Sequence, residues 1–432
     1  MKLEHLIVWI LFPAVVLSQH SISGTFSPPE DYTFAFLYKS TPDGANYIDR
    51  AQTDREGNFK IELDSLSEPG IYKIVYAIPP EENNFDIIYN GKEDVVFTFC
   101  LDDGIAFTKS KENILWANYV ESIQTINSTI SNFYESQSKN KKEFANIFKT
   151  LNDTQKAYES NSKGMIAERF VKANEPYIPS DFEDANTYAS NLKASFLKHI
   201  DFTDEVLQSS DFLVDRVNSY VFDIIANPTT ENFQTLIDEL DAIIGEQDNH
   251  FKSILYTNIW QRFVTDNNTE MALYITNKYL LSLAEGDNNQ SLLGALNSYK
   301  NTAIGAKAVN FDIPLHSTDL YAINTSKQYL LIFWSSSCSH CLKELPQVKT
   351  LLENNNEIQV IAIGIEEDEP QWQHEVEKYP SFVHKVELDK WDSDLVKAYN
   401  IKSTPSYFLL DSNKVILDKP YDFEALKALV EK

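Results

Sequence analysis

The pattern of apolar and polar positions changes character twice along the chain. Between residues 19 and 109, short apolar runs alternate with turn residues such as Asn90-Gly91, a pattern typical of strands. The predicted strands are Tyr32 to Tyr38, Asn58 to Leu63, Tyr72 to Ile78, Phe85 to Tyr89 and Val95 to Phe99. We therefore predict a small antiparallel β-sandwich over residues 19–109.

Residues 110–305 have long amphipathic periods, which predict helices. One helix has apolar residues on one face from Phe212 to Ile225 and ends at Asn227-Pro228. Similar periods run across Trp116 to Phe133, Phe182 to His199, Phe233 to Ile244, His250 to Val264 and Met271 to Leu283. The region is predicted to be an all-helical domain.

Residues 306–432 alternate strand and helix patterns, as an α/β sheet requires. The acidic run Glu366-Glu367-Asp368-Glu369 falls in the loop after the second predicted strand, and we predict that solvent surrounds it. Predicted strands are Tyr329 to Trp334, Ile358 to Gly364, Phe382 to Leu388, Tyr407 to Leu410 and Val415 to Leu417. The predicted fold class is therefore a multidomain α+β chain that ends in an α/β domain.

Length, charge and composition limit the function classes. A chain of 432 residues is too long for one ordinary core and predicts two or three domains. The formal net charge of -27 works against binding to nucleic acid or to anionic membranes. Hydrophobic residues make up 43% of the chain, which is ample for packed cores.

Residues 1–18 have the pattern of a signal peptide. Met1-Lys2 precede an apolar run from Leu6 to Leu17, which is shorter than the roughly 20 residues that a membrane span needs. We expect cleavage after export, no stable membrane insertion afterwards, and a location in the periplasm or cell envelope of a Gram-negative bacterium. Such a compartment permits disulfides.

The sequence contains three cysteines, and two of them form a Cys-x-x-Cys pair. Cys100, at the end of a predicted strand, is expected to be a buried and inert thiol. Cys338 and Cys341 lie where a buried strand turns into a helix. There the helix N-terminus, with its unpaired N–H groups, stabilises a thiolate on the first cysteine.

A redox disulfide is favoured over the other uses of such a pair. Haem attachment needs a His directly after the second cysteine, where this chain has Leu342. Structural zinc needs four ligands, and the sequence offers no second Cys pair to complete a site around Cys338 and Cys341. We predict no metal and no cofactor.

The spacing assigns different roles to the two thiols. Cys338, one residue ahead of the helix, is predicted to be the exposed nucleophile of low pKa, and Cys341, one turn into the helix, the shielded resolving thiol. An imidazolium at His340 favours the Cys338 thiolate, so a Ser-His dipeptide should raise the reduction potential relative to Gly-Pro.

The C-terminal region resembles the exported thiol-disulfide oxidoreductases of the TlpA/ResA type, which have a thioredoxin fold. The resemblance rests on Phe333-Trp334, on Cys338-Ser339-His340-Cys341 with Glu344 and Pro346 in one helix, and on Ser403-Thr404-Pro405 before the hairpin. It implies that Pro405 is a cis-proline facing the disulfide. It also implies that the Thr404 backbone pairs with an extended substrate and that Glu344 relays protons to the cysteines.

Two further comparisons qualify this resemblance. The family has an aromatic residue directly before the first cysteine, whereas this chain has Ser335-Ser336-Ser337, so we expect its redox potential and partner surface to differ. Residues 20–305 resemble the N-terminal parts of exported bacterial thioredoxin-like proteins, in which a small β domain of unknown function has a turn like Asp54-Arg55-Glu56-Gly57-Asn58-Phe59.

The leading hypothesis is a thiol-disulfide oxidoreductase that acts on protein thiols and disulfides and exchanges electrons with an upstream redox partner. One alternative is an envelope-binding adaptor in which the redox domain is secondary. Another is a thiol peroxidase, whose motif needs Thr and Pro where this chain has Ser335 and Leu331. The direction of exchange, the substrate and the role of residues 19–305 stay open.

Overall fold

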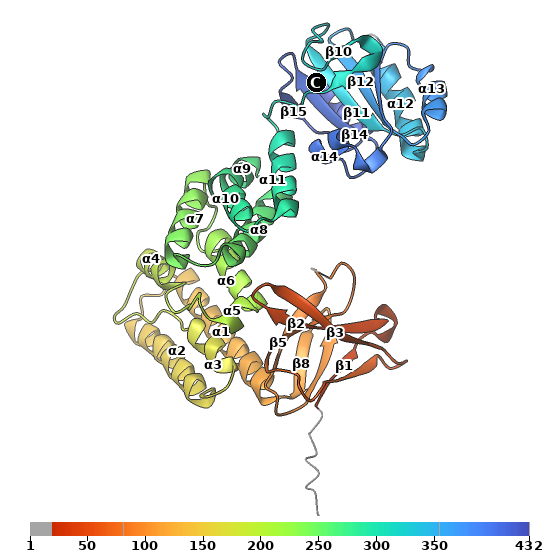
Figure 1. Cartoon of the computed structure of the whole chain (residues 1–432). Helices are drawn as coiled ribbons and strands as arrows, with labels where there is room; N and C mark the ends of the chain where they lie inside the picture. The colour runs from red at the N-terminus through yellow and green to blue at the C-terminus, as the bar shows by residue number, and fades with distance from the viewer. Residues whose placement is uncertain (1–19, 81, 354, 432) are drawn as a thin grey trace, which may run out of the picture. The chain divides into compact units, whose positions relative to one another are not determined.

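The computed structural model describes residues 20–80, 82–353 and 355–431 and divides the chain into two compact units. The first unit extends to residue 251 and the second covers residues 252–432. The predicted export signal, residues 1–18, lies outside the described residues. Figure 1 colours the chain in sequence order, from red at the N-terminus to blue at the C-terminus.

The first unit opens with two four-stranded sheets that pack as a sandwich, as predicted (Figure 1). Their facing sides share one core of aliphatic and aromatic side chains, which includes Phe26, Phe59 and Phe97. One sheet has the order β4 (Asn58–Glu62), β1 (Ser21–Phe26), β7 (Val95–Cys100), β8 (Gly104–Lys109). The other has the order β3 (Gly44–Gln52), β2 (Phe34–Thr41), β5 (Gly70–Val75), β6 (Asn84–Tyr89).

One strand pairing in the sandwich is parallel. β1 pairs antiparallel with β4 but parallel with β7, so the sandwich is not purely antiparallel. The hydrophobic pattern did not predict β3, because this strand is exposed along almost its whole length. Its membership of the sheet comes from backbone pairing with β2 rather than from burial.

The prediction that Cys100 is buried is wrong. Phe97 and Phe99 point into the sandwich, and the alternation of a strand puts Cys100, the last residue of β7, on the other side. Cys100 is a free, half-buried thiol, and its Sγ accepts a hydrogen bond from the backbone N–H of Asp103 at 3.2 Å.

The rest of the first unit is helical. Asn113, in the first turn of α1, docks this layer on the sandwich, because its side chain bonds both the N–H and the C=O of Ile88 in β6. α2 is absent from the specific helices predicted, since only a narrow stripe of it is apolar and buried. The helices are α1 (Lys111–Glu135), α2 (Lys141–Asn161), α3 (Ala167–Ala173), α4 (Ala185–Ser195), α5 (Glu205–Gln208), α6 (Asp211–Phe222) and α7 (Thr230–Ile244).

The second unit begins with helices and continues into an α/β domain. The helices are α8 (Asn249–Thr265), which starts just before the unit boundary, α9 (Thr269–Ile275), a π-helical turn (Thr276–Leu280), α10 (Leu281–Gly286) and α11 (Gln290–Thr302). No helix within the described residues has both the length and the apolar character to cross a membrane. The predicted domain limits at 109 and 305 stay a prediction.

The α/β domain is built on a five-stranded mixed sheet. Its order is β13 (Val383–Glu387), β12 (Ile358–Ile365), β11 (Gln328–Trp334), β14 (Ser406–Asp411), β15 (Ile416–Asp418). β11, β12 and β13 are parallel, and β14 runs antiparallel to β11 and β15. The other strands and α-helices are β9 (Asp312–Ile313), β10 (Thr318–Asp319), α12 (Ser339–Leu352), α13 (Glu369–Val376), α14 (Asp394–Ala398) and α15 (Phe423–Val430).

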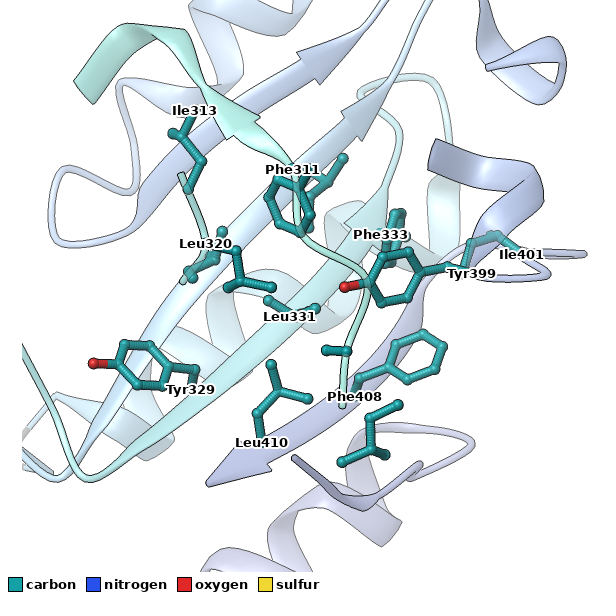
Figure 2. Packing of buried hydrophobic residues seen from close by; sticks show 14 of the residues in the cluster. Phe311, Ile313, Leu320, Tyr329, Leu331, Phe333, Tyr399, Ile401, Phe408 and Leu410 are labelled. Carbon is teal, nitrogen blue, oxygen red and sulfur yellow. The ribbon is translucent and has the colours of Figure 1, made fainter. Parts of the chain in front are cut away.

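The central strand β11 is buried on both faces. Tyr329, Leu331 and Phe333 point to one face, where Figure 2 shows them packed with side chains of β14 and of the segments around Phe311 and Tyr399. Leu330, Ile332 and Trp334 point to the other face, in a cluster with residues of α12 and with Trp372 of α13. Because packing on both faces restrains β11, the loop that follows Trp334 begins at a well-defined position.

We predict that Gly364→Ala destabilises the α/β domain. Gly364 lies in β12 opposite Trp334, and a Cβ there would meet the buried indole of Trp372 at 2.3 Å. Overpacking of this kind costs about 1–3 kcal/mol. Urea unfolding of the full chain measures the loss.

Gly294→Ala in α11 is the matched control, because a Cβ there meets nothing within 4 Å. Inside a helix this change should stabilise by roughly 0.5–1 kcal/mol. Equal effects of the two substitutions would show that the contact with Trp372 does not limit position 364.

Candidate active site

The Cys-x-x-Cys motif lies where β11 passes into α12. Three serines follow Trp334, and Cys338 then takes the N-cap position of α12. Its Sγ accepts a hydrogen bond from the backbone N–H of Cys341 at 3.2 Å. The sulfur thus replaces the oxygen of a usual N-cap residue and lies at the positive end of the helix.

The two thiols have opposite environments. Cys338 is half-buried, whereas Cys341 is fully buried, and both are free. Partial burial acts to raise the pKa of Cys338, but its interactions with Cys341, Thr404 and the His340 backbone together lower the pKa below the ordinary value. Burial raises the pKa of Cys341 to about 12. Cys338 therefore has the lower pKa of the two, in the predicted order, but it is half-buried and not exposed as predicted.

Thr404 and Pro405 lie against the motif because β14 is antiparallel to β11. Ser406, the first residue of β14, pairs with Phe333 near the end of β11. The loop before β14 therefore reaches the same edge of the sheet as Cys338. The Thr404-Pro405 peptide bond is cis, which confirms the prediction, and the Cys338 thiol donates a hydrogen bond to the Thr404 carbonyl at 3.4 Å.

Glu344 lies on α12 one turn beyond the motif and is half-buried. Its carboxylate accepts a hydrogen bond from the Tyr407 hydroxyl at 2.7 Å. Burial and then this bond raise the pKa of Tyr407, so its hydroxyl remains a donor. Sequence reasoning missed Tyr407, because an aromatic residue in a buried strand resembles core. The sequence signal that could have identified Tyr407 is its position two residues after Pro405.

His340 is exposed and lies beside an open cavity. The cavity reaches Glu344, so the carboxylate that holds Tyr407 is also accessible to solvent protons. Its volume is ≈ 250 Å³, and it is lined by His340, Lys343, Glu344, Gln347, Asp422, Phe423 and Glu424. Within the described part of the chain, no group of three or more His, Cys, Asp or Glu side chains is arranged to hold a metal ion.

The prediction that solvent surrounds the acidic run after β12 is wrong for Glu366. This carboxylate is 3% exposed, whereas Glu367 and Asp368 next to it are exposed. Glu366 lies at the carboxyl end of β12, directly beside the serines that follow β11. Burial was not visible in the sequence, because the side chains that receive this carboxylate are 30 residues away.

Comparison with known proteins agrees with this geometry. Residues 326–416 match the family model described as Thioredoxin-like. A thioredoxin-like protein from Bacteroides caccae is 17% identical in sequence, and its structure matches with a TM-score of 0.40. The match covers 59% of this chain and 96% of that protein. A thiol-disulfide oxidoreductase from Bacteroides fragilis is 22% identical in sequence, and its structure matches with a TM-score of 0.26. The match covers 29% of this chain and 97% of that protein.

A thiol:disulfide interchange protein from a Bacteroides species shares 23% identity with a TM-score of 0.27, over 30% of this chain and 90% of its own. No curated protein matches the chain. The family match, together with the motif between β11 and α12 and the cis-proline before β14, defines the C-terminal domain as thioredoxin-like.

We predict that Cys341→Ala raises the pKa of Cys338. The substitution removes the Cys341 thiol, whose hydrogen bond favours the Cys338 thiolate, but it keeps the backbone N–H donor. A hydrogen bond to a charged group is worth about 1.5–3 kcal/mol when complete. Because the backbone donor remains, we expect a rise of about half a unit to one unit.

The rate of iodoacetamide alkylation against pH measures this pKa in a Cys100→Ser background. Cys100→Ser alone, with Cys341 in place, is the reference. A pKa of Cys338 that is unchanged or lower in Cys341→Ala would show that the buried thiol does not stabilise the thiolate.

Proposed function

We propose that this chain is an exported thiol-disulfide oxidoreductase of the TlpA/ResA type that exchanges disulfides with protein partners. The observation that carries the proposal is the unequal pair at the start of α12. Cys338 is half-buried and its pKa is lowered, whereas Cys341 is fully buried and its pKa is raised. Disulfide exchange needs this asymmetry, because one thiol attacks the partner first and the other resolves the mixed disulfide afterwards.

The proposed reaction has two displacement steps. The Cys338 thiolate attacks one sulfur of a partner disulfide, a mixed disulfide forms, and the other partner sulfur leaves as a thiolate. Cys341 then gives up its proton and attacks the Cys338 sulfur, which releases the second partner thiolate. The partner gains two electrons and the enzyme holds a Cys338-Cys341 disulfide. The reverse sequence oxidises a dithiol partner.

Glu344, Thr404 and Pro405 support these steps in the proposal. Glu344 accepts the proton that Cys341 releases and passes it to solvent through the open cavity beside it. The Thr404 carbonyl, 3.4 Å from the Cys338 Sγ, belongs to the backbone that an extended partner segment would pair with. An upstream redox partner restores the starting state, and the periplasm or cell envelope is the proposed location.

We predict that the full chain with Cys341→Ala accumulates mixed disulfides with protein partners. Without the second thiol the Cys338 adduct cannot be resolved, so it persists. Expression in the exporting cell, acid quenching and non-reducing gel electrophoresis would show adducts that reductant removes.

Cys338→Ser with Cys341→Ala is the matched control and should give no adducts. Cys100 is present in both variants, so any adduct through that thiol appears equally in the two. Equal adducts in the two variants, or none in Cys341→Ala, would contradict the proposed exchange.

We also predict that His340→Pro makes the reduction potential more negative. A protonated imidazole at this exposed position and the His340 backbone N–H, which helps to lower the pKa of Cys338, both favour the thiolate of the reduced form, and proline supplies neither. A tenfold change in the equilibrium corresponds to about 30 mV for this two-electron couple, and we expect a shift of roughly that size. Equilibration with glutathione buffers measures it.

Ser339→Ala alters the neighbouring exposed position without changing charge and should leave the potential unchanged. A His340→Pro potential equal to that of the unmodified chain would show that His340 does not set the redox balance.

A further inference from the structure

The segment Ser335-Ser336-Ser337, which precedes the nucleophilic thiol, is held by a single buried carboxylate. The Glu366 carboxylate accepts hydrogen bonds from the backbone N–H of Ser336, from the Ser336 hydroxyl at 3.0 Å and from the Ser335 hydroxyl at 3.3 Å. Both serines are buried, at 8% and 3% exposure. Three donors from two consecutive residues thus converge on one side chain.

The bonds continue from this anchor to Cys338. The Ser335 and Ser337 hydroxyls are 2.9 Å apart, and the N–H of Ser337 donates to the Ser335 hydroxyl at 3.2 Å. The N–H of Cys338 donates to the Ser335 carbonyl at 3.1 Å. Ser335 is therefore bonded on one side to Glu366 and on the other to the backbone of the nucleophile.

Glu366 is itself fixed in place. It directly follows β12, and its backbone N–H donates to the carbonyl of Glu387 at the end of β13 at 2.9 Å. Among the described residues, no cationic side chain forms an ion pair with it. A buried carboxylate without a counter-ion is costly unless neutral donors satisfy it, and here the serines supply them.

We propose that Glu366 is a positioning residue for the thiol pair: it fixes the backbone of Ser335–Ser337 so that Cys338 stays at the N-cap of α12. This inference rests on the proposed function of Cys338 as the nucleophile. Ser335 and Ser336 are bonded directly to Glu366, and Ser337, which precedes Cys338, joins these bonds through the Ser335 hydroxyl.

The test separates the acceptor role of Glu366 from its charge. Glu366→Met keeps the length of the side chain and replaces both carboxylate oxygens, leaving only a weakly accepting sulfur. Glu366→Gln removes the charge but keeps an oxygen that can accept from the Ser336 N–H, while its amide can donate to the hydroxyls. Glu367→Met is the matched control, because Glu367 is exposed and adjacent.

The readout is the pH profile of Cys338 alkylation in the full chain with Cys100→Ser. We expect Glu366→Met to raise the apparent pKa of Cys338 by about one unit, which is tenfold in thiolate fraction. Glu366→Gln should restore most of the difference, and Glu367→Met should leave the profile unchanged.

Two outcomes would overturn the proposal. If both substitutions at 366 lower the pKa of Cys338 equally, the carboxylate acts through its charge. If neither moves the pKa, its role is confined to stability. Should Glu366→Met not fold, Ser336→Ala, which removes one donor and keeps Glu366, must give a smaller rise of the pKa, and no rise would refute the inference.

This assay needs no partner and no turnover. Failure of disulfide capture would therefore refute the proposed function while the alkylation profile still reported on Glu366. Conversely, an unchanged profile in the Glu366 variants would leave capture by Cys341→Ala as a valid test of the exchange reaction.

Discussion

The proposed exchange starts from the hydrogen bond that the Cys341 N–H donates to the Cys338 sulfur at the first turn of α12, one of several that lower the pKa of Cys338. This bond places the sulfur at the positive end of a helix, where a thiolate is favoured. The same turn carries Cys341 into the core beneath, where burial keeps its proton. The difference in pKa between the two thiols therefore follows from the geometry of the first turn of α12.

The sheet supplies the rest of the site. β11 is buried on both faces, so its end and the motif that follows have a fixed position. The antiparallel neighbour β14 brings Thr404 and Pro405 to that end, and the parallel neighbour β12 brings Glu366 to it from the other side. The motif thus contacts two loops whose bonded residues lie 30 and 66 residues away in sequence.

Local patterns revealed the motif, the order of the thiols and the cis-proline, because spacing along one helix and a short resemblance determine them. Such reasoning could not find Glu366, and for Tyr407 it offered only the position two residues after Pro405. An acidic run resembles a solvated loop, and a tyrosine in a strand resembles core, until pairing of β12 and β14 with β11 sets their partners. Cys100 shows the same limit, since its exposure depends on which way one strand end faces.

The most direct test is a redox titration of the full chain with Cys100→Ser in glutathione buffers, followed by mass spectrometry of the alkylated peptides. The account predicts one reversible two-electron transition, in which Cys338 and Cys341 lose their alkylation together and form an intramolecular disulfide. Glutathione adducts on Cys338 with Cys341 remaining a free thiol throughout would contradict it, because the buried thiol would then have no part in exchange.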